Sequence, residues 1–138
     1  MDDNEPDTAE FARAMFTTDV ASNALGMHLL HSAPGTATVA MTVVDTMVNG
    51  HAITHGGYVF TLADTASAVA CNGYGEPTVA AGAAITFLAP TTVGDELVAE
   101  AAERVRQGRS GIYDVTVRCG DKVIAEFRGN SRQVGRRP

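Results

Sequence analysis

A single carboxylate interrupts a long uncharged stretch of the sequence. In THGGYVFTLADTASAVACN, residues 54–72, Asp64 is the only formally charged residue, and it remains the only one between Thr46 and Gly75. A carboxylate with apolar neighbours has a raised pKa, which suits it to act on a carbonyl carbon as a general base or a nucleophile. An Asp at a helix edge that faces solvent would give the same pattern, so both interpretations stay open.

Two glycines begin the same stretch. Gly56 and Gly57 stand where a helix over residues 56–72 should start, and the first N–H groups of a helix have no partner within it. Such N–H groups, at the positive end of the helix dipole, stabilise a negatively charged oxygen, and the missing side chains let a carbonyl oxygen come close. The pair would equally suit a tight turn without a chemical role.

The spacing of these two features predicts a second chain. Gly56 and Asp64 are eight residues apart, which on a helix is about 12 Å along the axis and about 80° around it. One carbonyl group cannot touch both. If both act on it, the Gly56 amide must come from one subunit and the Asp64 carboxylate from the other, in a symmetric homodimer with two sites.

One long helix and several strands must position these residues. The stretch 56–72 lacks strand alternation and is rich in Ala, so we expect a helix that other structure surrounds. Residues 36–44, TATVAMTVV, alternate and are β-branched, as in a strand. After Pro77 the sequence predicts four long antiparallel strands: TVAAGAAITFL, DELVAEAAERVRQ, SGIYDVTVRC and KVIAEFRGNSR. The sum is one early strand, the helix and four strands, an α+β fold with a curved antiparallel sheet wrapped around a long central helix.

Residues 1–25 are expected to form an N-terminal helical segment. Asp7 and Glu10 are spaced like a capping box before the apolar FARAMF. Asp19 can cap a second short turn, which Gly26 would end.

Length and composition fit one domain over residues 1–138. The hydrophobic content of 45% is enough to fill a single core. The two cysteines are too few for a disulfide framework or a metal site. The first ten residues are acidic rather than leader-like, and Gly, Pro, His and Thr break the uncharged runs. We therefore expect a soluble cytoplasmic protein that does not span a membrane.

The two signs of charge are segregated along the chain. Residues 1–103 hold thirteen acidic residues and one basic residue, whereas residues 104–138 hold nine basic and three acidic residues. A basic C-terminal third could attract a phosphorylated ligand, although solvated arginines on exposed strands would give the same count. The net charge of −6 and the absence of Trp argue against nucleic-acid binding.

Four segments together resemble one family. NGHAITHGGYVFTLADTASAVACN at 49–72, ITFLAP at 85–90, QGRSGIYDV at 107–115 and FRGNS at 127–131 resemble the hotdog-fold acyl-CoA thioesterases, most closely the PaaI-type enzymes of phenylacetic acid degradation. The resemblance covers nearly the whole chain from about residue 20. It implies hydrolysis of aryl-acetyl-CoA or related acyl-CoA thioesters to free acid and coenzyme A, without metal or redox cofactor. It also implies a site shared across a dimer, commonly within a homotetramer.

The resemblance assigns expected roles to four residues. Asp64 would be the nucleophile or general base, and Gly56 would supply the oxyanion N–H. Asn49 matches the family's Asn, whose amide could hold the attacking water or the carbonyl; a left-handed Asn-Gly turn is an equal alternative. His55 matches the His before the glycine pair and is expected to fix the start of the helix by hydrogen bonding.

Coenzyme A, as part of the substrate, would account for the basic C-terminal third. Its phosphates suit Arg side chains and the N–H groups of glycine turns, and its pantetheine arm suits strand backbone. The expected contacts are Gly57, Arg109, Ser110, Gly111, Arg128, Gly129, Asn130, Ser131 and Arg132.

The sequence departs from the family at one place. Related enzymes often carry a Ser or Thr on the strand after the helix, whereas residues 79–84 read VAAGAA. These small side chains would leave room for a bulky aryl or branched acyl group, and Tyr58 and Phe60 could line the acyl pocket. Two alternatives remain: a hotdog dehydratase acting on 3-hydroxyacyl thioesters, and a non-catalytic acyl-CoA-binding protein.

Overall fold

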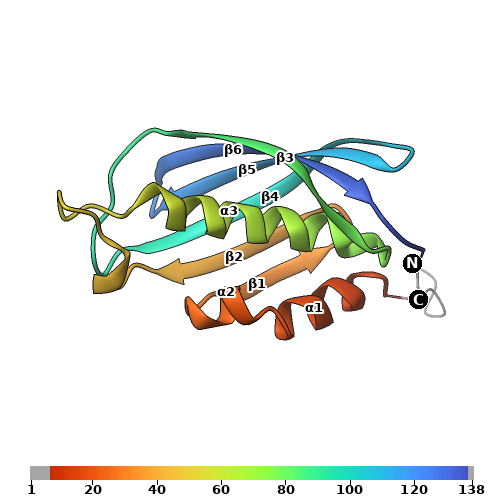
Figure 1. Cartoon of the computed structure of the whole chain (residues 1–138), viewed down its shortest axis with the longest axis horizontal. Helices are drawn as coiled ribbons and strands as arrows, with labels where there is room; N and C mark the ends of the chain where they lie inside the picture. Colours follow the sequence, from red (N-terminus) through yellow and green to blue (C-terminus); the bar gives the residue numbers. More distant parts are fainter. Residues whose placement is uncertain (1–6, 137–138) are drawn as a thin grey trace.

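A computed structural model of the chain describes residues 7–136. Its elements are α1 (Ala9–Thr17), α2 (Val20–Ala24), β1 (His28–Ala33), β2 (Thr36–Thr42), η1 (Asp45–Met47), α3 (Gly56–Cys71), η2 (Asn72–Tyr74), β3 (Thr78–Phe87), β4 (Glu96–Gln107), β5 (Ser110–Cys119) and β6 (Lys122–Gln133). These strands form a six-stranded antiparallel sheet in the order β1-β2-β4-β5-β6-β3. The sheet curves around α3, and α1 and α2 lie below it beside β1 (Figure 1). The predicted α+β fold, a curved sheet around one long helix, is confirmed.

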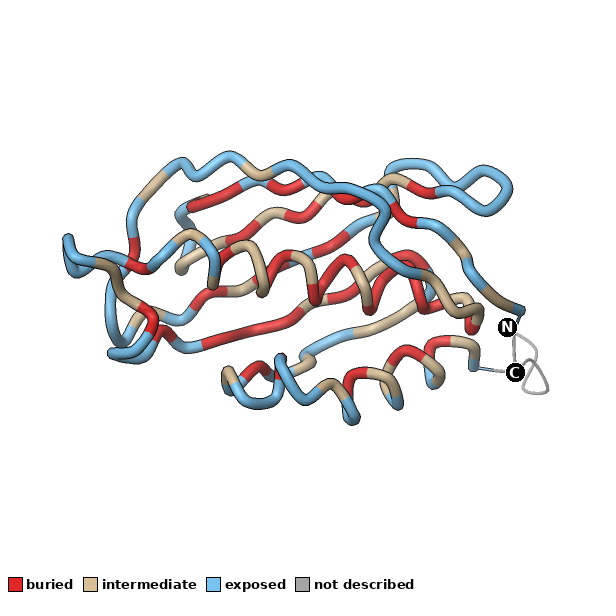
Figure 2. Tube along the Cα trace, viewed as in Figure 1, coloured by how far each residue is buried: buried red, intermediate tan, exposed pale blue. Residues whose placement is uncertain are grey.

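Helix α3 occupies the concave side of the sheet. Nine of its sixteen residues are buried (Figure 2). It begins at Gly56 and ends at Cys71, and Gly75 then takes a φ of 81°, which favours glycine. The expected helix over 56–72 is therefore correct to within one residue. Neither α3 nor any other helix within residues 7–136 has the length and apolar character needed to cross a membrane.

The inner face of the sheet and α3 share the hydrophobic core. On β5, Tyr113, Val115 and Val117 are buried against the helix while Asp114 and Thr116 point the other way, as their alternation predicted. The strands β2 and β4 contribute further buried side chains, including Val39, Met41, Leu97 and Ala99.

The structure has two strands before α3, β1 and β2, whereas the sequence predicted only one. Strand β1 pairs with β2 through a hairpin in which Gly35 takes a φ of 82°. As an edge strand it is only partly covered, with both His28 and Leu30 exposed, so HLLHSA carries no apolar alternation. Pairing with β2 in space, rather than a pattern in its own sequence, makes this segment a strand.

The N-terminal segment forms two short helices. Asp19 caps α2, because its side chain accepts a hydrogen bond from Ser22 N–H, as expected. The predicted capping box of Asp7 and Glu10 was wrong, because the N-cap of α1 is Thr8, whose side chain makes no capping hydrogen bond. The Asp7 carboxylate instead accepts a hydrogen bond from Ala9 N–H and forms an ion pair with Arg13. Residues 1–6 of the expected segment lie outside the described residues.

Strand β3 ends the sheet opposite β1. All ten of its residues are uncharged, and most are exposed. Strand β3 pairs with β6 on one side, and on its other side no strand of the described residues pairs with it. An uncharged, exposed sheet edge is a template for pairing with another strand.

Candidate functional site

Asp64 lies on the third turn of α3 at the edge of a small cavity. The side chain is half-buried, and the cavity of about 220 Å³ beside it is bounded by α1, α3, η2, β3 and β6. Most of its walls are small or uncharged side chains: Met15, Ser67, Ala68, Cys71, Asn72, Thr78, Val79, Ala80, Gly82, Gly129, Asn130 and Ser131. Among the described residues that line this cavity, Asp64 is thus the only one with a charged side chain.

Burial controls the ionisation of Asp64. Desolvation raises the pKa of its carboxyl above the ordinary value, and the negative charge of Asp19 raises it further. Within residues 7–136 no hydrogen-bond donor reaches this carboxylate to oppose the effect. Desolvation is the larger of the two causes that raise the pKa of Asp64.

The hydroxyl of Thr65 is turned to another partner. Its Oγ1 lies 2.9 Å from Ser22 Oγ, which in turn lies 2.6 Å from Asp19 Oδ2. Helix α2 thus supplies the partner of this hydroxyl, a contact that the sequence alone does not reveal.

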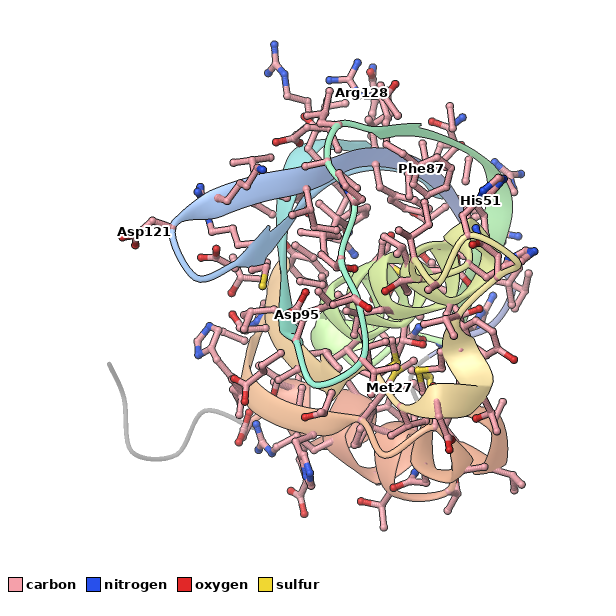
Figure 3. All side chains as sticks on the ribbon, turned by 90° about the vertical axis from the view of Figure 1, so that its left-hand side faces the viewer. Met27, His51, Phe87, Asp95, Asp121 and Arg128 are labelled. Carbon is pink, nitrogen blue, oxygen red and sulfur yellow. The ribbon has the colours of Figure 1, made fainter. Side chains whose placement is uncertain are left out.

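Gly56 opens a second, larger cavity. The space of about 500 Å³ is lined by Asn49, Ile53, Thr54, Gly56, Val59, Phe87, Leu88, Ala89, Pro90, Thr91 and Ile124. A Cβ at Gly56 would lie 2.7 Å from Phe87 Cζ, so a side chain there would force the ring to move. Phe87, which sequence reasoning did not single out, lies at the end of β3 in the direction of α3 (Figure 3).

The neighbours of Gly56 already have hydrogen-bond partners. His55 N–H donates to Met47 O at 2.7 Å, and Gly57 N–H donates to His55 Nδ1 at 2.9 Å. His55 is thus the N-cap of α3. Gly57 N–H, expected to contact coenzyme A, is occupied by this cap, whereas Gly56 N–H has no acceptor among the described residues.

Asn49 holds the loop before α3. Its Oδ1 accepts hydrogen bonds from His51 N–H at 2.9 Å and Ile53 N–H at 3.4 Å. The left-handed turn considered for Asn49 is wrong, because Ala52 is the residue of this loop with a positive φ, of 60°. The carboxamide oxygen is therefore structural, and Asn49 shares the cavity of Gly56.

Several residues expected to contact coenzyme A meet on the outer face of the sheet. Ser110 pairs with Arg132 and Gly111 with Ser131 across β5 and β6. A cavity of about 390 Å³ there is lined by Ala81, Val105, Gln107, Ser110, Gly111, Ile112, Asn130, Ser131 and Arg132. Arg109 lies beside it in the same turn, where its carbonyl accepts from Gln133 N–H at 2.7 Å.

Arg128 and Gly129 lie elsewhere. Arg128 makes a two-point ion pair with Asp114, at 2.7 and 3.0 Å, and points away from the molecule (Figure 3). This guanidinium lowers the pKa of Asp114. Gly129 faces inward, where a Cβ would lie 2.9 Å from Ser67 Oγ, so it borders the cavity of Asp64 instead.

The aromatic residues considered for the acyl pocket pack within the protomer. Tyr58 meets the His55 ring edge-on, with centroids 6.3 Å apart, and Phe60 meets Phe127 in the same way at 5.4 Å. Neither Tyr58 nor Phe60 lines the cavity of Asp64 or that of Gly56.

Within residues 7–136 no group of three His, Cys, Asp or Glu side chains is arranged to hold a metal ion.

Comparisons with known proteins show that the chain is similar to thioesterases. The family model of the Thioesterase superfamily matches residues 51–126. The chain is 43% identical over 125 residues to acyl-coenzyme A thioesterase PaaI of Escherichia coli, which covers 90% of this chain and 89% of that protein. The solved structure of E. coli PaaI, from the phenylacetic acid degradation operon, matches with a TM-score of 0.89 and 39% identity, covering 94% of this chain and 98% of the other.

A further solved structure carries a ligand. The Streptococcus mutans protein smu.793, bound to acetyl-CoA, matches with a TM-score of 0.78 and 26% identity, covering 81% of this chain and 91% of the other.

Proposed function

Because this chain belongs to the Thioesterase superfamily and is an acyl-CoA thioesterase of the PaaI type, we propose that it hydrolyses aryl-acetyl-CoA thioesters in a site that two subunits share. Asp64 of one subunit is the base or nucleophile, and Gly56 N–H of the other stabilises the oxyanion. The products are the free acid and coenzyme A. The working form is a cytoplasmic homotetramer of two such dimers, with no cofactor beyond the coenzyme A of the substrate.

One observation carries this proposal: the two halves of the site lie at opposite ends of β3. Phe87, the last residue of β3, covers Gly56, while Ala80 and Gly82 near its beginning border the cavity of Asp64. Gly56 and Asp64 thus face two separate cavities of one protomer. The residues that line the cavity of Gly56 include no carboxylate, and those that line the cavity of Asp64 do not include Gly56.

A two-fold axis through the middle of β3 would complete both cavities at once. Two β3 edges paired about such an axis run antiparallel. The Phe87 end of one strand then meets the Thr78 end of the other, so the start of one α3 approaches the Asp64 cavity of the second subunit. The uncharged, exposed edge of β3 supports this pairing, because no charge would have to be buried.

The position of the outer cavity supports its use for coenzyme A. Asn130 and Ser131 border both the cavity of Asp64 and the outer cavity of Arg132. A pantetheine arm that follows β6 there would connect the reacting thioester to phosphates near Arg132 and Ser110. The bound acetyl-CoA of the related S. mutans protein supports a coenzyme A thioester as the ligand.

The environment of Asp64 favours proton abstraction. A carboxylate with a raised pKa is a stronger base, and without a hydrogen-bonded donor its oxygens are free to accept a proton from water. The water oxygen would attack the carbonyl carbon, the oxyanion would be held by Gly56 N–H, and the C–S bond would then break to release the thiolate of coenzyme A. The same carboxylate could instead attack directly and form a mixed anhydride.

Small residues beside Asp64 support a bulky acyl group. Ala68, Ala80, Gly82 and Gly129 present at most a methyl group to the cavity. A planar aryl group could lie against them with little rearrangement.

A panel of acyl-CoA esters tests the proposed function. We expect the wild type to release free thiol faster from phenylacetyl-CoA than from acetyl-CoA or palmitoyl-CoA. Asp64→Asn should lower kcat by about 100- to 10,000-fold and leave KM nearly unchanged. The matched control is Asp45→Asn, an exposed carboxylate in η1, which should hydrolyse as the wild type does. An Asp64→Asn variant of full activity would remove this residue from the mechanism.

A further inference from the structure

The hydroxyl of Ser67 has no hydrogen-bond partner in the described part of the chain. Ser67 is buried on α3, with 7% of its surface exposed, and no hydrogen bond involves its Oγ. Other hydroxyls of the same helix are bonded: Thr61 Oγ1 donates to Gly57 O at 2.8 Å, and Thr65 Oγ1 lies 2.9 Å from Ser22 Oγ. A buried hydroxyl without a protein partner is normally satisfied by water or by a ligand.

This hydroxyl opens into the cavity of Asp64. Among the described residues no side-chain oxygen that is sealed from water lacks a partner, so water can reach Ser67 Oγ. Ser67 lines the cavity of about 220 Å³ together with Asp64, which stands one turn earlier on α3. Residues three apart on a helix lie on the same side, with Cβ atoms about 5–6 Å apart. Gly129 leaves room for the hydroxyl, because a Cβ there would lie 2.9 Å from Ser67 Oγ.

The other polar side chains of this lining are engaged elsewhere. Asn72 is bonded through both polar atoms of its carboxamide, at 2.8 to 3.0 Å. Thr78 Oγ1 and Cys71 Sγ each donate to a backbone carbonyl. On β6, Asn130 and Ser131 also border the outer cavity, where coenzyme A is proposed to bind. Among the described residues of α3 and η2, the serine hydroxyl is thus the polar group of the lining that is free to bind a ligand beside the carboxylate.

We infer that Ser67 is a catalytic residue of the proposed hydrolysis, in which its Oγ and the Asp64 carboxylate hold the attacking water between them. This inference rests on the proposed function of Asp64. A hydrogen bond to water spans about 2.7–2.8 Å between oxygens, so one water can join two oxygens up to about 5.5 Å apart. Side chains one turn apart on a helix reach such a separation.

The two side chains give the water a defined orientation. It donates one proton to Asp64 and the other to Ser67 Oγ, which leaves a lone pair of its oxygen for the carbonyl carbon. As the O–C bond forms, the first proton passes to Asp64, and the carbonyl electrons move to the oxygen held by the Gly56 N–H of the other subunit. The C–S bond then breaks, and the thiolate of coenzyme A takes the proton from Asp64. Ser67 keeps its own proton throughout and orients the nucleophile.

A double-mutant cycle with phenylacetyl-CoA tests this arrangement. In the wild type, Ser67→Ala should lower kcat by about 10-fold, the loss of one hydrogen bond to the nucleophile, and leave KM nearly unchanged. In the Asp64→Asn background the same change should lower kcat by less than about 2-fold, because the two side chains act on one water and their effects are not additive.

Thr65→Val is the matched control. It removes a second buried hydroxyl of α3, one that bonds to Ser22 of α2 and does not line the cavity, and valine has nearly the same shape as threonine. Thr65→Val should keep the wild-type kcat, and thermal melting checks that each variant is folded. A readout besides activity is a high-resolution crystal structure. It should show one water within hydrogen-bond distance of both Asp64 and Ser67 in the wild type, and the Ser67→Ala structure should lack it.

The outcomes separate this inference from the proposed function. A wild-type kcat in Ser67→Ala, equal losses in Ser67→Ala and Thr65→Val, or the same loss in both backgrounds overturns the role of Ser67 even though the wild type hydrolyses acyl-CoA. A wild-type crystal without the shared water overturns it as well. A wild type that hydrolyses none of the acyl-CoA esters instead overturns the proposed function.

Discussion

His55 Nδ1 accepts the N–H of Gly57 at 2.9 Å, and this cap leaves the N–H of Gly56 without an acceptor among residues 7–136 at the mouth of a 500 Å³ cavity. A helix start normally offers several unpaired donors that water can reach. Here the His55 side chain accepts the N–H of Gly57, so the N–H of Gly56 is the donor that remains at the cavity. Gly56 N–H is therefore the donor that we propose for the oxyanion.

Removing that donor should abolish most of the turnover. Gly56→Pro deletes the N–H at the first helical position, where proline fits the helix backbone. We expect kcat to fall by about 100- to 1,000-fold, the usual effect of losing one oxyanion donor. Because any side chain at this position meets Phe87, Gly56→Ala is the matched control, since it adds a methyl group and keeps the N–H. Equal losses in both variants would assign the effect to crowding rather than to the hydrogen bond.

The raised pKa of Asp64 also predicts a pH-dependent cost in stability. Because the folded state binds the Asp64 proton more tightly than the unfolded state, the free energy of unfolding decreases as pH rises from the ordinary pKa of 3.8 through the raised value. Asp64→Asn should therefore melt at a higher temperature than wild type at neutral pH, and this gain should vanish in acid. Melting curves measured across pH check this, and a variant that is less stable at neutral pH would contradict it.

The outer cavity predicts which arginine serves coenzyme A. Arg132 lines that cavity, whereas Arg118 is paired with Glu100 on the outer strand face. Arg132→Gln should raise KM for acyl-CoA by roughly 10- to 100-fold, the loss of one charge-assisted hydrogen bond, and leave kcat close to wild type. Arg118→Gln is the matched control and should keep KM unchanged. The effect of Arg132 should also weaken as salt concentration increases, and a KM that does not respond to Arg132→Gln would move the phosphate site elsewhere.

Isotope transfer tests whether Asp64 attacks the thioester directly. In a single turnover in H₂¹⁸O, general-base catalysis places ¹⁸O in the product acid, because water attacks the carbonyl directly. A mixed anhydride opened by water at the enzyme carboxyl would instead leave ¹⁸O in Asp64 and release an unlabelled acid, whereas one opened at the acyl carbon would label the acid as general-base catalysis does. Incorporation of ¹⁸O into Asp64 is therefore the outcome that identifies direct attack. Mass spectrometry of the acid and of the peptide containing Asp64 reads both outcomes. We expect labelled acid, because Asp64 combines a raised pKa with unoccupied oxygens.

The parts of this site that local sequence determines were predictable. The helix over 56–72 followed from its Ala-rich, uncharged composition, and the cap of α2 by Asp19 followed from its position before a short helical turn. The separation of Gly56 from Asp64 followed from helix geometry alone, and in the structure the two residues do face separate cavities.

Contacts between distant segments were not predictable in the same way. Thr65 and Ser22 are 43 residues apart, and neither sequence context indicates the other. Arg128 and Gly129 are adjacent in FRGNSR, but strand alternation sends one to the outer face and the other to the cavity of Asp64. Strand β1 lacked a pattern because its pairing with β2, rather than its own burial, defines it.

Mixing two inactive subunits tests the shared site most directly. Gly56→Pro and Asp64→Asn each damage one half of every site, so either homodimer should be nearly inactive. A mixed dimer carries both changes in one site and none in the other. After unfolding and refolding at equal concentrations, random pairing should restore about a quarter of wild-type activity on phenylacetyl-CoA, because half of the dimers are mixed and each holds one intact site. A mixture no more active than the two homodimers would contradict a site built from Gly56 of one subunit and Asp64 of the other.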